Sequence, residues 1–235
     1  FSSSVAEEFG ATTSFPTPVV ESTGTGGGLK LFCAGVEINT PDIANASRAM
    51  KASEFKMCQE NGVTDITEAL IGFDGIAIAQ SSKVQGFNVT KEQLALAVAK
   101  EVPAADGKSL IANPYKKWSD ISNNLPNREI IVYGPPKSSG TRDSFEELVL
   151  QSVFEKKAVY TDLFKKDEVA NKKYKAYSEI RTDGVFVESG ENDNLIVQKL
   201  TKNEAAVGIF GYSFLAENKD KVVGLSIDNV LPTVE

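Results

Sequence analysis

Residues 129–157, EIIVYGPPKSSGTRDSFEELVLQSVFEKK, form the stretch that decides the fold. Its apolar start predicts a buried strand, and the part that follows Thr141 predicts a helix. Hydroxyls, free backbone N–H groups and the positive end of a helix dipole therefore meet between the two elements. Arg142 adds a guanidinium that can donate two parallel hydrogen bonds. Helix capping explains one hydroxyl but not the succession of two serines, a glycine, a threonine and an arginine over 138–142. This succession favours an anion-binding loop.

The same alternation of strand and helix continues on both sides of this stretch. Further strands are expected over 17–23, 41–47, 69–80, 184–190, 205–212 and 221–228. Helices are expected from the start of the chain to Gly10, over 28–35, over 52–62 with Ser53 as N-cap, after the capping box of Thr90 and Gln93, and over 192–200. This alternation predicts an α/β fold. Two lobes are expected, 1–75 and 76–235, joined near Asp74–Ile78.

A second informative stretch, ESTGTGGGLKLF (21–32), places several glycines before an apolar run. Such a segment can cradle a phosphate, because glycine lets backbone N–H groups approach an anion closely. It lacks the Lys-Ser/Thr pair of a Walker A motif and the third glycine of a dinucleotide fingerprint. A glycine-rich loop without a ligand therefore stays as an equal alternative.

Two more loops contain suitable donors. Ser47 follows an apolar stretch in DIANASRAM (42–50), and Asn192 and Asp193 begin a helix in SGENDNLIVQKL (189–200). Each alone is explained by a surface position or by capping. The four loops together could enclose a small oxyanion, because such loops gather at the carboxyl ends of strands in α/β sheets.

Composition excludes several classes of function. The net charge of −7 argues against a nucleic-acid or anionic-membrane surface. The chain has no histidine, which excludes Ser-His-Asp hydrolases, His-ligated zinc enzymes and papain-like proteases. No nucleophile–base pair and no metal-ligand cluster can be read, so we expect no catalytic residue, metal or cofactor. The two cysteines, Cys33 and Cys58, are either a buried thiol pair or a disulfide.

An ordered set of motifs then gives a resemblance. The set is VVESTGTGGGLKLFCAG, TPDIANASR, IGFDGIAIAQ, NPYKKWSDI, SGTRDSF, GENDNLIVQKL and GIFGYSF. In this set the chain resembles the periplasmic phosphate-binding proteins of ABC-type high-affinity phosphate uptake systems. The resemblance implies a two-lobed type II solute-binding fold that captures inorganic phosphate between its lobes and delivers it to the membrane permease. It also implies a periplasmic monomer that is not an enzyme and binds no nucleic acid.

The resemblance also implies which residues bind phosphate, because each matches a phosphate-binding position of the family. These residues are Thr25, Gly26, Ser47, Ser139, Gly140, Thr141, Arg142, Asn192 and Asp193. Some family members have an Asp directly after the Ser of the second loop, where it accepts a proton from the anion. This chain has Arg48 there, so the acceptor lies elsewhere. Asp193, a backbone carbonyl and Asp42 are the candidates.

The resemblance also bears on the cysteines and on the extent of the fold. In an oxidising periplasm Cys33 and Cys58 are expected to pair, with a free buried pair as the alternative. The family has a strand and a phosphate loop before the opening helix and a returning strand later, so we expect the fold to lack its first strand and its C-terminal return segment. The alternatives are a binding protein for sulfate or molybdate, a phosphate-scavenging or interaction protein outside transport, and an enzyme acting on phosphate esters.

Overall fold

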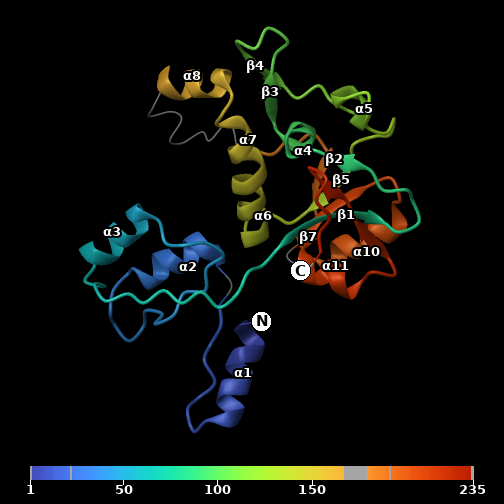
Figure 1. Cartoon of the computed structure of the whole chain (residues 1–235). Helices are drawn as coiled ribbons and strands as arrows, with labels where there is room; N and C mark the ends of the chain where they lie inside the picture. The colour runs from blue at the N-terminus through green and yellow to red at the C-terminus, as the bar shows by residue number, and fades with distance from the viewer. Residues whose placement is uncertain (1, 22, 167–178, 191, 234–235) are drawn as a thin grey trace. The chain divides into compact units, whose positions relative to one another are not determined.

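The computed structural model describes residues 2–21, 23–166, 179–190 and 192–233. The chain divides into two compact units, Phe1–Gly72 and Phe73–Glu235, which are described separately below. The second unit contains a five-stranded sheet with the order β6-β5-β7-β1-β8 (Figure 1). Its strands are β1 Ile76–Ser81, β5 Val132–Gly134, β6 Phe186–Glu188, β7 Val207–Gly211 and β8 Val222–Gly224.

The direction of these strands determines where their loops meet. β5 runs parallel to both β6 and β7, while β1 runs antiparallel to β7 and β8. Because β5, β6 and β7 point the same way, their carboxyl ends lie at one edge of the sheet. The predicted α/β architecture is confirmed for this unit.

Helices α10 (Asn194–Lys202) and α11 (Tyr212–Glu217) cover one face of the sheet (Figure 1). Alternate strand residues point to this face, as expected from the two-residue period of a strand. Gly208 allows the close approach, since a Cβ there would lie 2.8 Å from atoms of Ile196 and Leu200. The residues buried between the helices and the sheet are Ala77, Ala79, Ile196, Val197, Leu200, Ala206, Phe210, Leu215 and Val222.

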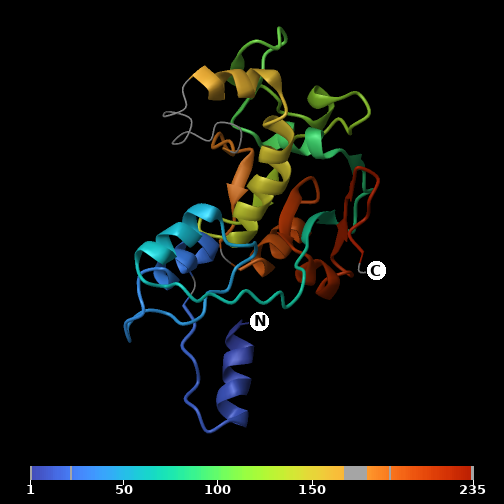
Figure 2. The same cartoon turned by 60° about the vertical axis from the view of Figure 1, so that its left-hand side comes forward.

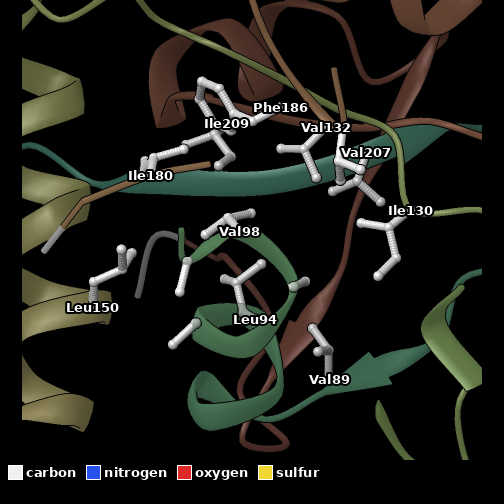
Figure 3. Close-up of a cluster of buried hydrophobic side chains, with 14 of the residues drawn as sticks. Val89, Leu94, Val98, Ile130, Val132, Leu150, Ile180, Phe186, Val207 and Ile209 are labelled. Carbon is white, nitrogen blue, oxygen red and sulfur yellow. The ribbon is translucent and has the colours of Figure 1, made fainter. Parts of the chain in front are cut away.

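The other face of the sheet packs against α4 (Lys91–Val98) and a long helix. That helix consists of α6 (Gly140–Phe145), the π-helical turn η1 (Glu146–Gln151) and α7 (Ser152–Phe154), which Figures 1 and 2 show as one continuous ribbon. Figure 3 shows the core on this side, to which α4 contributes Leu94 and Val98, the long helix Leu150, and the sheet Val132, Val207 and Ile209.

The remaining elements of the second unit are short. They are β2 Asn88–Val89 paired in parallel with β9 Ser226–Ile227, β3 Glu101–Pro103 paired with β4 Leu110–Ala112, α5 Trp118–Ile121 and α8 Ala158–Lys166. The predicted capping box at α4 is confirmed. The hydroxyl of Thr90 accepts from the Gln93 backbone N–H at 3.1 Å, and the Gln93 side chain accepts from the Thr90 N–H at 2.9 Å.

The first unit contains α1 (Ser2–Thr12), α2 (Gly24–Phe32) and α3 (Ala52–Glu60). α2 and α3 lie side by side (Figures 1 and 2) and are joined by a disulfide between Cys33 and Cys58. Both cysteines are fully buried, and Val63 is buried with them. The expected pairing of the cysteines is therefore confirmed.

Several local expectations for the first unit were wrong. The strands expected over 17–23 and 41–47 do not form in the described residues, where Val19 is 89% and Ile43 is 76% exposed. A strand needs a hydrogen-bonded neighbour, and the described part of this unit has none. The glycine segment is not a loop but the first turn of α2, because burial of Leu29 outweighs the weak helix propensity of glycine.

Some expected boundaries also differ. Of the strand expected over 69–80, only the part from Ile76 onward forms, as β1. Lys51, not Ser53, precedes the first residue of α3. The opening helix runs to Thr12 instead of ending at Gly10. The last expected strand is divided into β8 and β9 by buried Leu225.

Candidate functional site

Helix starts follow the carboxyl ends of β5, β6 and β7. β5 leads through 135–139 into α6, β6 leads through 189–193 into α10, and β7 leads directly into α11. Two hydrogen bonds join these connections. The Ser189 N–H donates to the Gly134 carbonyl at 2.9 Å, and the Gly211 N–H donates to Asp193 Oδ2 at 3.0 Å. The edge of the sheet therefore gathers the loops that the sequence singled out, as in other α/β sheets.

Arg142 is the buried cation at this edge, with a side chain only 3% exposed. Its Nε donates to Glu146 Oε1 at 2.6 Å, and its Nη1 donates to the Pro135 carbonyl at 3.2 Å. Nη1 also lies 3.5 Å from Glu188 Oε1, and the guanidinium sits 4.6 Å from the centre of the Phe186 ring. These contacts fix the guanidinium in one orientation between the loop that follows β5 and the end of β6.

Ser139, Gly140 and Thr141 begin the helix that holds Arg142. Ser139 is the N-cap residue in an extended conformation, and its side chain makes no capping hydrogen bond. The first backbone N–H groups of a helix have no partner within the helix. Together with the hydroxyls of Ser139 and Thr141, they form a set of neutral donors in the turn that leads to Arg142. Such a set can bind a small anion.

The first unit brings two other predicted residues into contact. The Ser47 N–H donates to Thr25 Oγ1 at 3.1 Å, and the two hydroxyl oxygens lie 3.0 Å apart. Thr25 is buried in the first turn of α2, whereas Ser47 is exposed. Gly26 follows Thr25, and a Cβ there would meet no atom within 4 Å. The hydroxyls of two separate sequence motifs are therefore in contact beside the N-terminus of α2.

Arg48 forms a salt bridge within the first unit. Its Nη1 and Nη2 donate to the two carboxylate oxygens of Glu54 at 2.9 and 2.8 Å. Glu54 also accepts from the Lys51 backbone N–H at 2.8 Å at the start of α3. The hydrogen bonds from Arg48, then that from Lys51, lower the pKa of Glu54 from 4.5 to about 2 against the opposing effect of burial. Arg48 therefore ties the Ser47 loop to α3.

Asn192 and Asp193 lie at the same edge as Arg142, and their side chains accept hydrogen bonds from backbone N–H groups. Asn192 Oδ1 accepts from the Asn194 N–H at 3.0 Å, and Asn192 is exposed. Asp193 is 7% exposed and accepts from the Gly211 N–H. These bonds fix the start of α10 and join it to the end of β7.

A family model described as a PBP superfamily domain matches residues 1–235. The chain belongs to the PBP superfamily. Two curated relatives show the same relationship. Protein SphX of Synechococcus elongatus is 30% identical over 100% of this chain and 58% of its own length. Phosphate-binding protein PstS of Staphylococcus saprophyticus is 30% identical over 86% of this chain and 48% of its own length. This PBP-superfamily chain therefore spans about half the length of the curated relatives it matches.

A solved structure agrees with the family assignment. The crystal structure of a possible phosphate-binding protein from Planctomyces limnophilus matches with a TM-score of 0.59 and 25% identity. The match covers 99% of this chain and 70% of that one. The predicted solute-binding α/β fold is thus confirmed for this member of the PBP superfamily.

Sequence reasoning missed two carboxylates of this PBP-superfamily chain, Glu146 and Glu188, that flank Arg142. The four-residue spacing between Arg142 and Glu146 on one helix was a usable signal, because such residues face each other. Glu188 had only a weak signal, its position within the strand predicted over 184–190, whose observed form β6 ends at this residue.

Two further properties concern the described ranges, 2–21, 23–166, 179–190 and 192–233. These ranges contain no group of at least three His, Cys, Asp or Glu side chains arranged to hold a metal ion. None of the helices formed there has the length and apolar character needed to cross a lipid bilayer.

Proposed function

We propose that this chain is the substrate-binding component of an ABC phosphate importer, which captures inorganic phosphate and delivers it to the membrane permease. The observation that carries the proposal is Arg142, buried and held in one orientation in a helix whose N-cap hydroxyl, that of Ser139, makes no capping hydrogen bond. The names of two similar proteins support the same ligand: one is the phosphate-binding protein PstS, and the other is described as a possible phosphate-binding protein from Planctomyces limnophilus.

The proposed chemistry is recognition without reaction. A tetrahedral oxyanion accepts hydrogen bonds at every oxygen, and the helix start in the second unit offers neutral donors, the hydroxyls of Ser139 and Thr141. Arg142 adds a guanidinium that is already oriented, so little side-chain freedom is lost when the anion binds. No covalent step is required, and we propose that the protein is not an enzyme.

We further propose that the protein works in the periplasm as a monomer. The buried disulfide between Cys33 and Cys58 supports this location, because disulfides form and persist in oxidising compartments and are rare in the cytosol.

Isothermal titration of the phosphate-free chain with phosphate tests the proposal. The wild-type chain should bind phosphate, and Arg142→Met should weaken binding about 10- to 150-fold, since a hydrogen bond to a charged group contributes about 1.5–3 kcal/mol. The methionine keeps the apolar contact with Phe186. Glu146 and Glu188 retain side-chain exposures of 27% and 48%, so neither becomes a buried unpaired charge.

Lys137→Gln is the matched control. It removes one positive charge from the same loop, but Lys137 is exposed and precedes the donors of the helix start. Its phosphate affinity should stay within about threefold of wild type, because exposed charges are well screened. Absence of phosphate binding by the wild-type chain, or equal losses in the two variants, contradicts the proposed function.

A further inference from the structure

We infer that Glu188 is a specificity-determining residue, the carboxylate that accepts a hydrogen bond from a protonated oxyanion held by Arg142. The inference rests on the proposed function and extends it to the choice between anions. It assigns a role to a residue that lies outside the motifs from which the site was predicted.

The position of Glu188 follows from the sheet. It is the last residue of β6 and pairs with Gly134, the last residue of β5, in parallel register. Its carboxylate therefore lies at the edge from which the loop to α6 begins. Glu188 Oε1 is 3.5 Å from Arg142 Nη1, so it faces the guanidinium that the proposed function assigns to the anion.

This carboxylate is also available to a ligand. The 3.5 Å separation is longer than the roughly 2.7–2.9 Å of a tight charge-assisted hydrogen bond. Within the described parts of the chain, no side-chain hydrogen bond of Glu188 is found, and its side chain is 48% exposed. Its oxygens are thus close to Arg142 and accessible from solvent.

The other carboxylates nearby are already engaged. Glu146 accepts from Arg142 Nε at 2.6 Å, and Asp193 is buried against the Gly211 N–H. Glu188 remains as the acceptor beside the buried guanidinium.

The chemistry of this position separates two classes of anion. An ionised carboxylate can only accept hydrogen bonds. Phosphate near neutral pH keeps at least one P–OH group and can donate to it. Sulfate is fully ionised and has no hydrogen to donate. A sulfate oxygen beside the carboxylate would therefore be repelled by its like charge, and no hydrogen bond would offset the repulsion. Glu188 should therefore favour protonated phosphate and penalise sulfate.

The test is titration of wild-type chain and Glu188→Gln with phosphate and with sulfate at pH 7. The amide can donate to a sulfate oxygen as well as accept from a P–OH group. We expect the ratio of phosphate to sulfate affinity to fall about 10-fold or more in E188Q, the size associated with a charge-assisted hydrogen bond. Unchanged Trp118 emission should confirm that the second unit is folded.

Glu147→Gln is the matched control, because it removes one negative charge from an exposed position next to Glu146. Its anion ratio should equal that of wild type. A wild-type chain that binds phosphate while E188Q keeps the wild-type ratio overturns the role of Glu188 alone. An equal change in E147Q also overturns it, since net charge would then explain the effect. A wild-type chain that binds neither anion overturns the proposed function and this inference together.

Discussion

Removal of the Glu54 carboxylate should destabilise the first unit at neutral pH. Glu54 joins three parts of that unit, because it accepts two hydrogen bonds from Arg48 after the Ser47 loop and one from the Lys51 N–H before α3. Glu54→Gln keeps the size of the side chain but removes its charge. The variant therefore isolates the electrostatic contribution of this contact.

The magnitude follows from the pKa of Glu54. A decrease from 4.5 to about 2 corresponds to about 3 kcal/mol, at about 1.4 kcal/mol for each pKa unit. The Arg48 and Glu54 side chains are 25% and 16% exposed, so solvent screens part of this energy. We therefore expect a loss of about 1–2 kcal/mol in the free energy of unfolding of the first unit.

The sign of the pH dependence is fixed by the lowered pKa. A carboxylate with a depressed folded-state pKa contributes its full stability above its ordinary value of 4.5. That contribution is lost as the pH falls from about 4.5 towards about 2. The stability difference between wild type and E54Q should therefore be largest at pH 7 and should disappear near pH 2.

Amide hydrogen exchange of α3 peptides, read by mass spectrometry and corrected for intrinsic rates, measures this difference. A loss of about 1–2 kcal/mol should raise the opening constant of α3 about 5- to 30-fold at pH 7. Emission of Trp118, the only tryptophan and fully buried in the second unit, should be unchanged.

Glu60→Gln provides the control on the same helix. Glu60 lies 3.7 Å from Lys56, with side chains 65% and 77% exposed, so its removal should change exchange less than twofold. Exchange of E54Q at the wild-type rate at pH 7 refutes the stabilising role of the Glu54 carboxylate. A difference between E54Q and wild type that is as large at pH 2 as at pH 7 refutes it as well.

Other perturbations test the packing of each unit. Reduction of the disulfide between Cys33 and Cys58, which are 25 residues apart, should destabilise the first unit by about 3 kcal/mol, visible as faster exchange of α2 and α3. Gly208→Ala should cost the second unit about 1–3 kcal/mol in urea unfolding followed by Trp118 fluorescence, because the new Cβ lies 2.8 Å from atoms of α10. Thr90→Ala should cost about 1 kcal/mol in the same assay, because α4 loses its cap.

Each of these predictions has its own control and contrary outcome. Reduction should leave Trp118 emission unchanged, and a parallel loss in both units would contradict a local role for the disulfide. Gly86→Ala should be nearly neutral, since its Cβ would lie 4.0 Å from the nearest side chain. Thr182→Ala, at an exposed position, should leave the unfolding midpoint unchanged. If Gly208→Ala is as stable as Gly86→Ala, the close packing of α10 on the sheet does not limit the size of residue 208. If Thr90→Ala is as stable as Thr182→Ala, the Thr90 cap does not stabilise α4.

Local patterns were sufficient wherever neighbours in sequence make the structure. The strand, loop and helix from 129 to 157 were predicted because apolar periodicity and capping residues act within a few positions of each other. The Thr90 capping box was predicted for the same reason. Composition left the state of the two cysteines open, and the family resemblance, which implies an oxidising compartment, favoured the disulfide.

Tertiary structure decided what depends on partners distant in sequence. The contact of Thr25 with Ser47 and that of Arg142 with Glu188 join segments that no local pattern relates. A strand is stable only beside another strand, so the apolar run at 17–23 could not show by itself that it lacks one in the described unit. The sequence by itself determined the strand–loop–helix order and the types of donor, whereas the fold determined which donors and carboxylates meet, because parallel strands bring distant loops to one edge.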